Sequence, residues 1–178
     1  MVANLKLDIK EILFVYGIGI ILTLISVLYF ILVGYPVVST VSETLNITAP
    51  PIYMNSVFLP YGILIGEIIW NWNQKKNWKI SIILFVETAV VGIFSLIRYI
   101  ISIPLSGHAI MLFFYIFHQA ISNKTKFLLR FLIGIVVLII TVIYKLFIWN
   151  DPITFILGAI AGIVLWIPGF FYQIMKRK

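Results

Sequence analysis

A few ionisable and polar side chains interrupt long apolar stretches of this sequence, and their chemistry gives the best clue to function. One set is Arg98, Ser106, Gly107, His108, Lys145, Asn150 and Asp151. A second set is Glu67, Glu87 and His118. Ionisable groups are costly in hydrocarbon and usually face other helices or water. Both sets are therefore candidate functional residues.

The first set suits an anionic ligand. Arg98 and Lys145 supply positive charge, and the helix expected to begin near Ser106 offers unpaired amides. A phosphate headgroup is a natural ligand for such a site. The alternative is structural, with Arg98 and Lys145 reaching the membrane interface and Asp151 capping the helix that starts at Pro152.

The second set suits transport. Apolar surroundings favour the neutral form of a carboxyl group, so Glu67 and Glu87 are candidates for proton coupling if they face each other. His118 lies in the same half of the expected bundle. The alternative is a neutral glutamate that hydrogen-bonds to a neighbouring helix, with His118 simply at the water boundary.

The composition predicts which elements position these residues. The chain has 178 residues, of which 62% are hydrophobic and 11% charged, and its mean hydropathy is +1.13. Lipid must be the solvent for so much apolar surface, and helices satisfy the backbone there. We expect an all-α integral membrane protein, one domain over residues 1–178, with six transmembrane helices. Their expected ranges are 12–33, 52–70, 80–101, 105–121, 127–149 and 153–174.

The basic residues predict the orientation of this bundle. Lysines and arginines gather at alternate connections and at both chain ends, which places both termini in the cytoplasm and the protein in the cell membrane. The net charge of +7 is explained by this orientation, and no nucleic-acid partner is expected. The first apolar run lacks an A-x-A cleavage site and is read as a retained helix. The loop from Gly34 to Pro51 is then external, and it carries the sequon Asn46-Ile47-Thr48.

Several kinds of chemistry have no signature in the sequence. Cysteine is absent, which excludes disulfides and thiol catalysis. Metal-ligand clusters, nucleotide loops and serine-hydrolase elbows are not found, so no metal or cofactor is expected. Gly158 and Gly162 have the spacing of small residues that lets helices approach closely, which predicts helix packing.

The stretch Leu105-Ser106-Gly107-His108-Ala109 resembles the P-S-G-H motif of the type 2 phosphatidic acid phosphatase (PAP2) superfamily of membrane lipid phosphatases. That motif opens the same helix on the same side of the membrane. The family's preceding motif, K-x6-R-P, ends the third helix. Arg98 matches its arginine, whereas Val91 stands at its lysine and the proline is missing.

The family's third motif, S-R-x5-H-x3-D, resembles the stretch that starts at Ile143. In this register Asn150 replaces the nucleophilic histidine and Thr154 replaces the supporting aspartate. The glycines that follow in the family match Gly158 and Gly162. The chain thus lacks the histidine that attacks phosphorus in the family.

The resemblance implies a role for each matching residue. Ser106 and Gly107 would bind phosphate, His108 would be the general acid, and Arg98 would neutralise charge. The ligand would be a polyprenyl or glycerolipid phosphate at the external membrane face. Asp151 is the nearby candidate for a replacement nucleophile. Binding of the lipid phosphate without hydrolysis is the other outcome.

Three functions therefore compete. A PAP2-like protein that binds or hydrolyses a lipid phosphate predicts that Arg98, His108 and Asn150 converge. A small transporter, or the substrate-binding membrane subunit of one, predicts a cavity that contains Glu67 and Glu87. A scaffold without a ligand predicts that both sets only pack or reach the interface.

Overall fold

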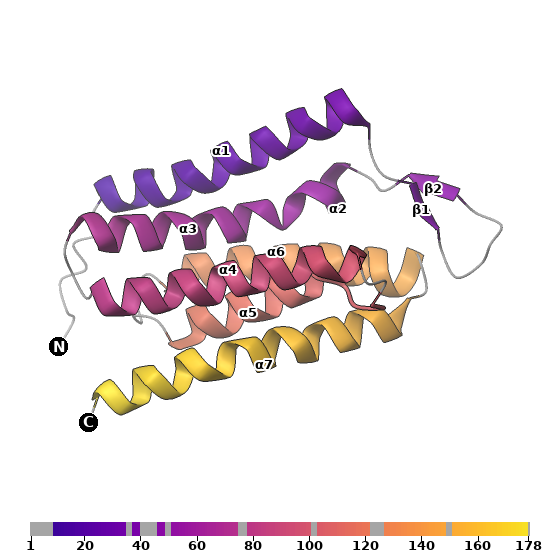
Figure 1. Ribbon diagram of the computed structural model, residues 1–178. Helices are drawn as coiled ribbons and strands as arrows, with labels where there is room; N and C mark the ends of the chain where they lie inside the picture. Colours follow the sequence, from indigo (N-terminus) through magenta and orange to yellow (C-terminus); the bar gives the residue numbers. More distant parts are fainter. Residues whose placement is uncertain are drawn as a thin grey trace.

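The computed structural model is a bundle of roughly parallel and antiparallel helices (Figure 1). It describes residues 9–34, 37–39, 46–48, 51–74, 78–100, 103–121, 127–148 and 151–177. The helices are α1 (Ile9–Val33), α2 (Pro51–Ser56), α3 (Phe58–Asn73), α4 (Trp78–Ile100), α5 (Gly107–Ile121), α6 (Phe127–Val142) and α7 (Pro152–Arg177). A π-helical turn, η1 (Ile143–Ile148), continues α6.

The helices form six continuous segments within these ranges, because α2 runs on into α3 through Val57 and α6 runs on into η1. Val57 keeps a helical backbone, with φ −70° and ψ −21°. The segments coincide with the six expected apolar runs to within a few residues. The expected all-helical body is confirmed.

The loop expected between the first two segments contains a short hairpin that the sequence reading did not predict. Strand β1 (Val37–Ser39) pairs antiparallel with β2 (Asn46–Thr48), and Val38 lies opposite Ile47. Gly34 ends α1 with φ 93°, a conformation that glycine adopts without steric cost. Asn46 of the sequon therefore lies in β2.

Three described segments are long and apolar enough to cross a membrane: Ile9–Val33, Leu128–Phe147 and Pro152–Phe171. A shorter apolar stretch, Ser81–Ser95, lies in α4. Large apolar side chains cover the outer faces, as in α1, where Leu32 is 84% exposed. Exposure of so large an apolar surface to water would be unfavourable, which identifies the chain as a membrane protein.

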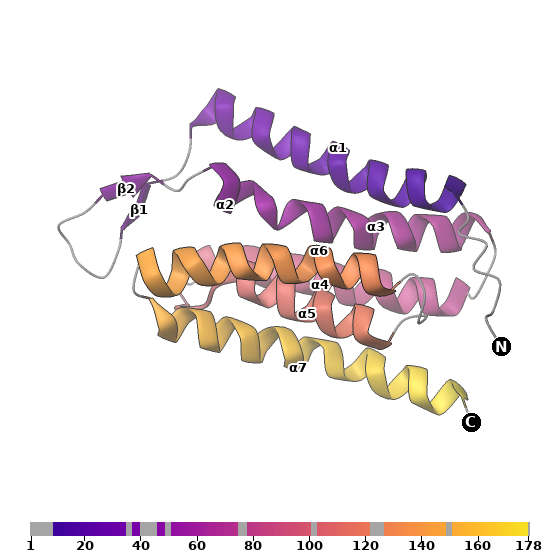
Figure 2. The ribbon, with the colours of Figure 1, turned by 180° about the vertical axis from the view of Figure 1, so that it is seen from behind.

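The ends of the bundle differ. At one end, here called the terminal end, α1 begins and α7 finishes (Figures 1 and 2). At the other, here called the hairpin end, α5 and α7 begin near the side where β1 and β2 extend (Figures 1 and 2). Polar residues from α5 and α7 therefore meet at the hairpin end.

Glycines allow the closest helix contacts. A Cβ on Gly62 of α3 would lie 2.6 Å from the Cα of Gly19 in α1, so only hydrogen atoms fit between these backbones. A Cβ on Gly158 of α7 would lie 2.6 Å from the carbonyl oxygen of Ser106, and one on Gly162 would strike the carbonyl of Ile110. The packing role expected for Gly158 and Gly162 is confirmed.

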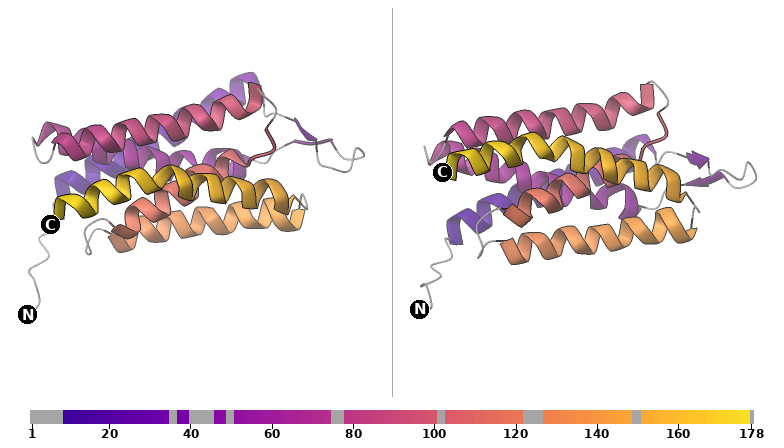
Figure 3. Two further views of the ribbon diagram at one scale, coloured as in Figure 1. Left: turned by 60° about the horizontal axis from the view of Figure 1, so that its bottom comes forward. Right: turned by 90° about the horizontal axis from the view of Figure 1, so that it is seen from below.

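Helix α5 is the centre of the bundle. It packs against α3, α4, α6 and α7, whereas α1 lies outside them against α2 and α3 (Figure 3). The core around α5 includes Ile110, Phe114 and Tyr115, which are at most 1% exposed. Both ends of α5 are thereby fixed relative to their neighbours.

Candidate functional site

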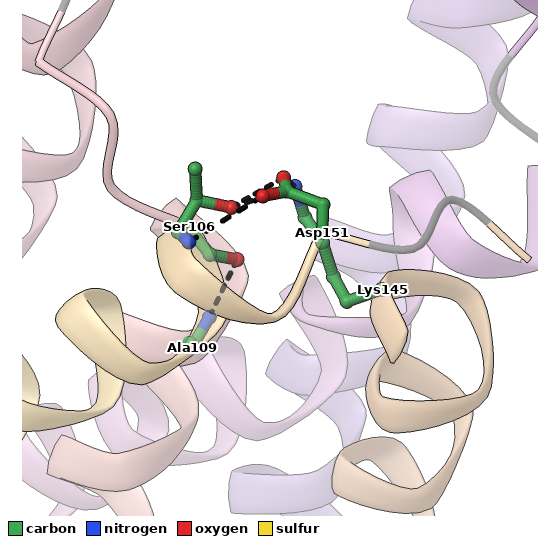
Figure 4. A network of polar contacts seen from close by, with 5 residues as sticks. Ser106, Ala109, Lys145 and Asp151 are labelled. Carbon is green, nitrogen blue, oxygen red and sulfur yellow. Dashed lines mark hydrogen bonds and ion pairs between the residues drawn. The ribbon is translucent and has the colours of Figure 1, made fainter. Parts of the chain in front are cut away.

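Three residues of the first expected set, Ser106, Lys145 and Asp151, come together at the hairpin end (Figure 4). The backbone N–H of Ser106 donates a 2.9 Å hydrogen bond to the carbonyl of Thr154, which joins the start of α5 to the first turn of α7. Ser106, Lys145 and Asp151 lie close together there (Figure 4). We call Ser106, Lys145, Asp151 and Thr154 the hairpin-end cluster.

Ser106 caps α5. Its Oγ accepts a 3.3 Å hydrogen bond from the N–H of Ala109 (Figure 4). Its carbonyl oxygen accepts a 3.0 Å hydrogen bond from the N–H of Ile110. A serine immediately before a helix satisfies one of the amides that the first turn leaves unpaired. The serine of the Ser-Gly-His stretch thus has a structural role, and it is 2% exposed.

Asp151 caps α7 in the same way. Its Oδ1 accepts a 3.4 Å hydrogen bond from the N–H of Thr154, and Thr154 Oγ1 also donates to Oδ2. Lys145 Nζ lies 2.9 Å from Oδ2 and 3.3 Å from Thr154 Oγ1. The capping role considered for Asp151 is confirmed, and Lys145 reaches this carboxylate from η1.

The carboxyl group of Asp151 is held in its charged form. Burial favours the neutral acid, but the hydrogen bonds from Thr154 and Lys145 and the charge of Lys145 outweigh it, so the pKa of Asp151 is lowered. Both Asp151 oxygens are already engaged by these neighbours. A carboxylate whose oxygens are engaged in this way is a poor nucleophile toward phosphorus.

The remaining residues of this set are placed less fully. Gly107 is the buried first residue of α5, and His108 follows it half-buried. Arg98 lies in the last turns of α4, but its side chain is outside the described part of the chain. Asn150 also lies outside the described residues. The expected convergence of Arg98, His108 and Asn150 remains a prediction.

A second polar group occupies the terminal end and was largely missed from the sequence. Arg130 of α6 places Nη1 2.8 Å from Glu67 Oε2 and Nη2 3.2 Å from Glu11 Oε1. Gln119 Nε2 donates a 3.2 Å hydrogen bond to the same Glu67 oxygen. We call Glu11, Glu67, Gln119 and Arg130 the terminal-end cluster. It connects α1, α3, α5 and α6.

Aromatic and imidazole groups surround this cluster. Tyr115 donates a 3.0 Å hydrogen bond to the carbonyl of Arg130, and Tyr16 lies against its guanidinium group. His118 is 4% exposed, stacks on Phe114 and lies within electrostatic range of Glu67 and Arg130. The sequence reading placed Glu67 and His118 in one region, and the structure brings them together.

Glu87 lies elsewhere. Its carboxyl group is packed against Gly169 of α7, whereas Glu67 is held by Arg130 and Gln119. The two glutamates expected to share a transport cavity therefore contact different helices. Glu67 has Arg130 beside it, whereas no cation of the described part of the chain pairs with Glu87.

One signal in the sequence could have revealed the terminal-end cluster. Arg130 is the single ionisable residue between Phe127 and Val142, in an otherwise apolar stretch. Glu11 opens the first apolar run and Glu67 closes the second, so all three share one membrane depth. Opposite charges at one depth are candidates for pairing.

Metal chemistry finds no support in the described part of the chain, where no group of three or more histidine, cysteine, aspartate or glutamate side chains comes together. No protein-family model, curated protein or solved structure matches the chain.

Proposed function

We propose that this protein binds a phosphorylated lipid at the hairpin end of its bundle and does not hydrolyse it. The observation that carries this proposal is the Ser106 N–H to Thr154 carbonyl hydrogen bond of 2.9 Å. It holds the starts of α5 and α7 together, and with them Ser106, Gly107 and Lys145. These residues are three of those expected to hold phosphate.

The electrostatics of this end support an anionic ligand. The amides of a helix's first turn point out of its start and carry partial positive charge. Helices α5 and α7 both begin here, and Lys145 adds a cation. Asp151 neutralises part of the positive charge of Lys145. A second cation is therefore needed to balance the phosphate, and we assign this role to Arg98. His108 would donate a hydrogen bond to the phosphate.

Binding without hydrolysis follows from the missing nucleophile. The PAP2 resemblance places Asn150 where the family has its attacking histidine. Asp151 is the alternative nucleophile, but its oxygens accept hydrogen bonds from Lys145 and Thr154. An engaged carboxylate of lowered pKa is a weak nucleophile, which favours a binding protein over a phosphatase.

The membrane topology belongs to the same proposal. We infer six membrane crossings with both termini in the cytoplasm and the hairpin end outside the cell membrane. Six continuous helical segments support this arrangement, as does the position of the start of α1 and the end of α7 at one end of the bundle (Figure 1). The ligand would then be a lipid of the outer leaflet.

Lipid binding to the purified protein tests the proposal. Native mass spectrometry with phosphatidic acid, a polyprenyl phosphate and phosphatidylglycerol compares phosphate monoesters with an anionic diester. We expect the monoesters to bind more tightly and Arg98→Gln to weaken them about tenfold, the effect of losing roughly 1.4 kcal/mol of charge-assisted hydrogen bonding. Lys10→Gln, which removes an exposed cation at the terminal end, is the matched control.

Two results would contradict this function. Equal binding of phosphatidylglycerol and phosphatidic acid would show attraction to charge alone. Phosphate release that His108→Ala abolishes would identify a phosphatase, and loss of the same activity in Asp151→Asn would identify its nucleophile.

A further inference from the structure

The carboxyl group of Glu87 lacks a cation partner in the described part of the structure. A Cβ on Gly169 would lie 2.6 Å from Glu87 Cδ, so the carboxyl group lies directly against the backbone of α7. Its Oε1 is buried and accepts no hydrogen bond from the described residues. The polar group that acts on the carboxyl is the Gly169 N–H, and no described charged group does so.

The position of Glu87 in α4 makes this environment apolar. Phe85 and Val86 beside it are more than half exposed and face the lipid side, whereas Leu84 and Val91 are buried in the bundle. Glu87 is half-buried at the border between these faces. Its carboxyl group thus lies between α4 and α7, inside the apolar stretch Ser81–Ser95.

Among the side chains that the structure describes on the packed helices, no replacement partner lies beside Glu87. Between Pro152 and Phe171, α7 contains no ionisable residue. On α3, Tyr61 donates its hydroxyl to the carbonyl of Thr88 and Glu67 binds Arg130. The ionisable residues of α5 are His108 at the hairpin end, and Tyr115 and His118 beside the terminal-end cluster.

We propose that Glu87 is a proton-binding site at the contact of α4 with α7. An isolated carboxylate in apolar surroundings is so costly that the group takes up a proton instead. Release of that proton to water leaves a negative charge against Gly169, and this charge must be hydrated. Proton release therefore loosens the contact of α4 with α7 at this point.

The backbone of α7 is irregular at the position that contacts Glu87. Pro168 precedes Gly169 inside the helix, and a proline lacks the N–H that would bond to the carbonyl four residues earlier, in Val164. Proline is a common cause of helix kinks. The site thus combines an ionisable carboxyl group with a position where the neighbouring helix lacks one backbone hydrogen bond.

Carbodiimide labelling of the full-length protein in detergent tests this site. Dicyclohexylcarbodiimide adds to protonated carboxyl groups in apolar surroundings, and peptide mass spectrometry locates the adduct. We expect an adduct on Glu87 that decreases about tenfold for each pH unit above the midpoint of its titration. Glu67 in the same molecule is the internal control, because its carboxyl group is engaged by Arg130 and Gln119 and should not be labelled.

Infrared difference spectra between acidic and alkaline pH give a second readout that does not depend on reagent access. The carbonyl stretch of a protonated carboxyl group should appear in the wild type and disappear in Glu87→Gln, which keeps the shape of the side chain. Identical spectra for the two proteins, or labelling of Glu87 that does not change with pH, would overturn the proposal.

Discussion

Nη1 of Arg130 lies 2.8 Å from Oε2 of Glu67, and the two side chains are only 4% and 14% exposed. The guanidinium group also reaches Glu11, so one cation lies between carboxylates from α1 and α3. Charges buried this deeply are tolerated when they are paired and hydrogen-bonded. The terminal-end cluster therefore joins α1, α3 and α6 through one shared cation.

Replacing Arg130 should strongly destabilise the bundle. Arg130→Met leaves Glu11 and Glu67 without their shared cation, and breaking a buried pair costs roughly 3–5 kcal/mol. Thermal unfolding in detergent, followed by circular dichroism, measures the loss. Arg130→Lys should lose less because it keeps the charge, although it cannot hold both carboxylates in a fixed fork.

A double variant distinguishes pairing from simple packing. Adding Glu67→Gln to Arg130→Met removes one of the stranded charges and should recover part of the lost stability. If the two substitutions destabilise additively, the ion pair with Glu67 does not contribute as described.

Stability at acidic pH should depend on Asp151. The folded-state pKa of Asp151 is lowered, so its contribution is fully present above the unfolded-state pKa and is lost as pH falls through the folded value. Asp151→Asn keeps a capping oxygen but loses the attraction to Lys145. The wild type should be more stable than this variant at neutral pH, and the difference should shrink in acid.

Unfolding curves of both proteins from neutral to strongly acidic pH provide the measurement. Lys145→Met should reduce the same pH dependence, because it removes the cation that lowers the Asp151 pKa. A wild-type advantage that stays constant over the whole pH range would contradict this role for the ion pair.

The sequence predicted the helical body because long apolar runs in lipid have few ways to satisfy their backbone. The expected helix boundaries also place Ser106, Lys145 and Asp151 near helix ends, which fixes their depth, and the structure brings the three together (Figure 4). Depth alone does not fix rotation about the helix axis. Glu67 and Glu87 share a half of the bundle, yet their side chains point to α6 and α7.

The pairing of Arg130 with Glu11 and Glu67 could not be derived for the same reason. Which helices are neighbours depends on packing surfaces such as those at Gly19 and Gly62, and these surfaces become apparent only in three dimensions. The short hairpin could not be predicted, because strands of three residues are too short to show an alternation of apolar and polar residues.

The contact of α1 with α3 should be sensitive to one methyl group. Gly62→Ala would place a Cβ 2.6 Å from the Cα of Gly19, and relief of such a clash by backbone movement costs roughly 1–3 kcal/mol. Gly17→Ala is the matched control on α1, because a Cβ there meets no atom within 4 Å. Equal thermal stability of the two variants would show that α1 does not pack on α3 in this way.

Tyr61 of α3 and Gly92 of α4 should be energetically coupled. A Cβ on Gly92 would lie 2.5 Å from the Tyr61 hydroxyl, which donates a 2.7 Å hydrogen bond to the carbonyl of Thr88. Gly92→Ala should therefore displace the hydroxyl and break this bond, at a cost of about 1–3 kcal/mol.

Removing that hydroxyl should make the alanine harmless. Tyr61→Phe loses the hydrogen bond and should cost about 0.5–1.5 kcal/mol on its own. In the Tyr61→Phe background the nearest ring carbon lies 3.6 Å from the new Cβ, an ordinary contact, so Gly92→Ala should be neutral or stabilising there. The unfolding free energies of the wild type, the two single variants and the double variant give the coupling energy. A coupling energy near zero would show that Tyr61 and Gly92 do not interact as described.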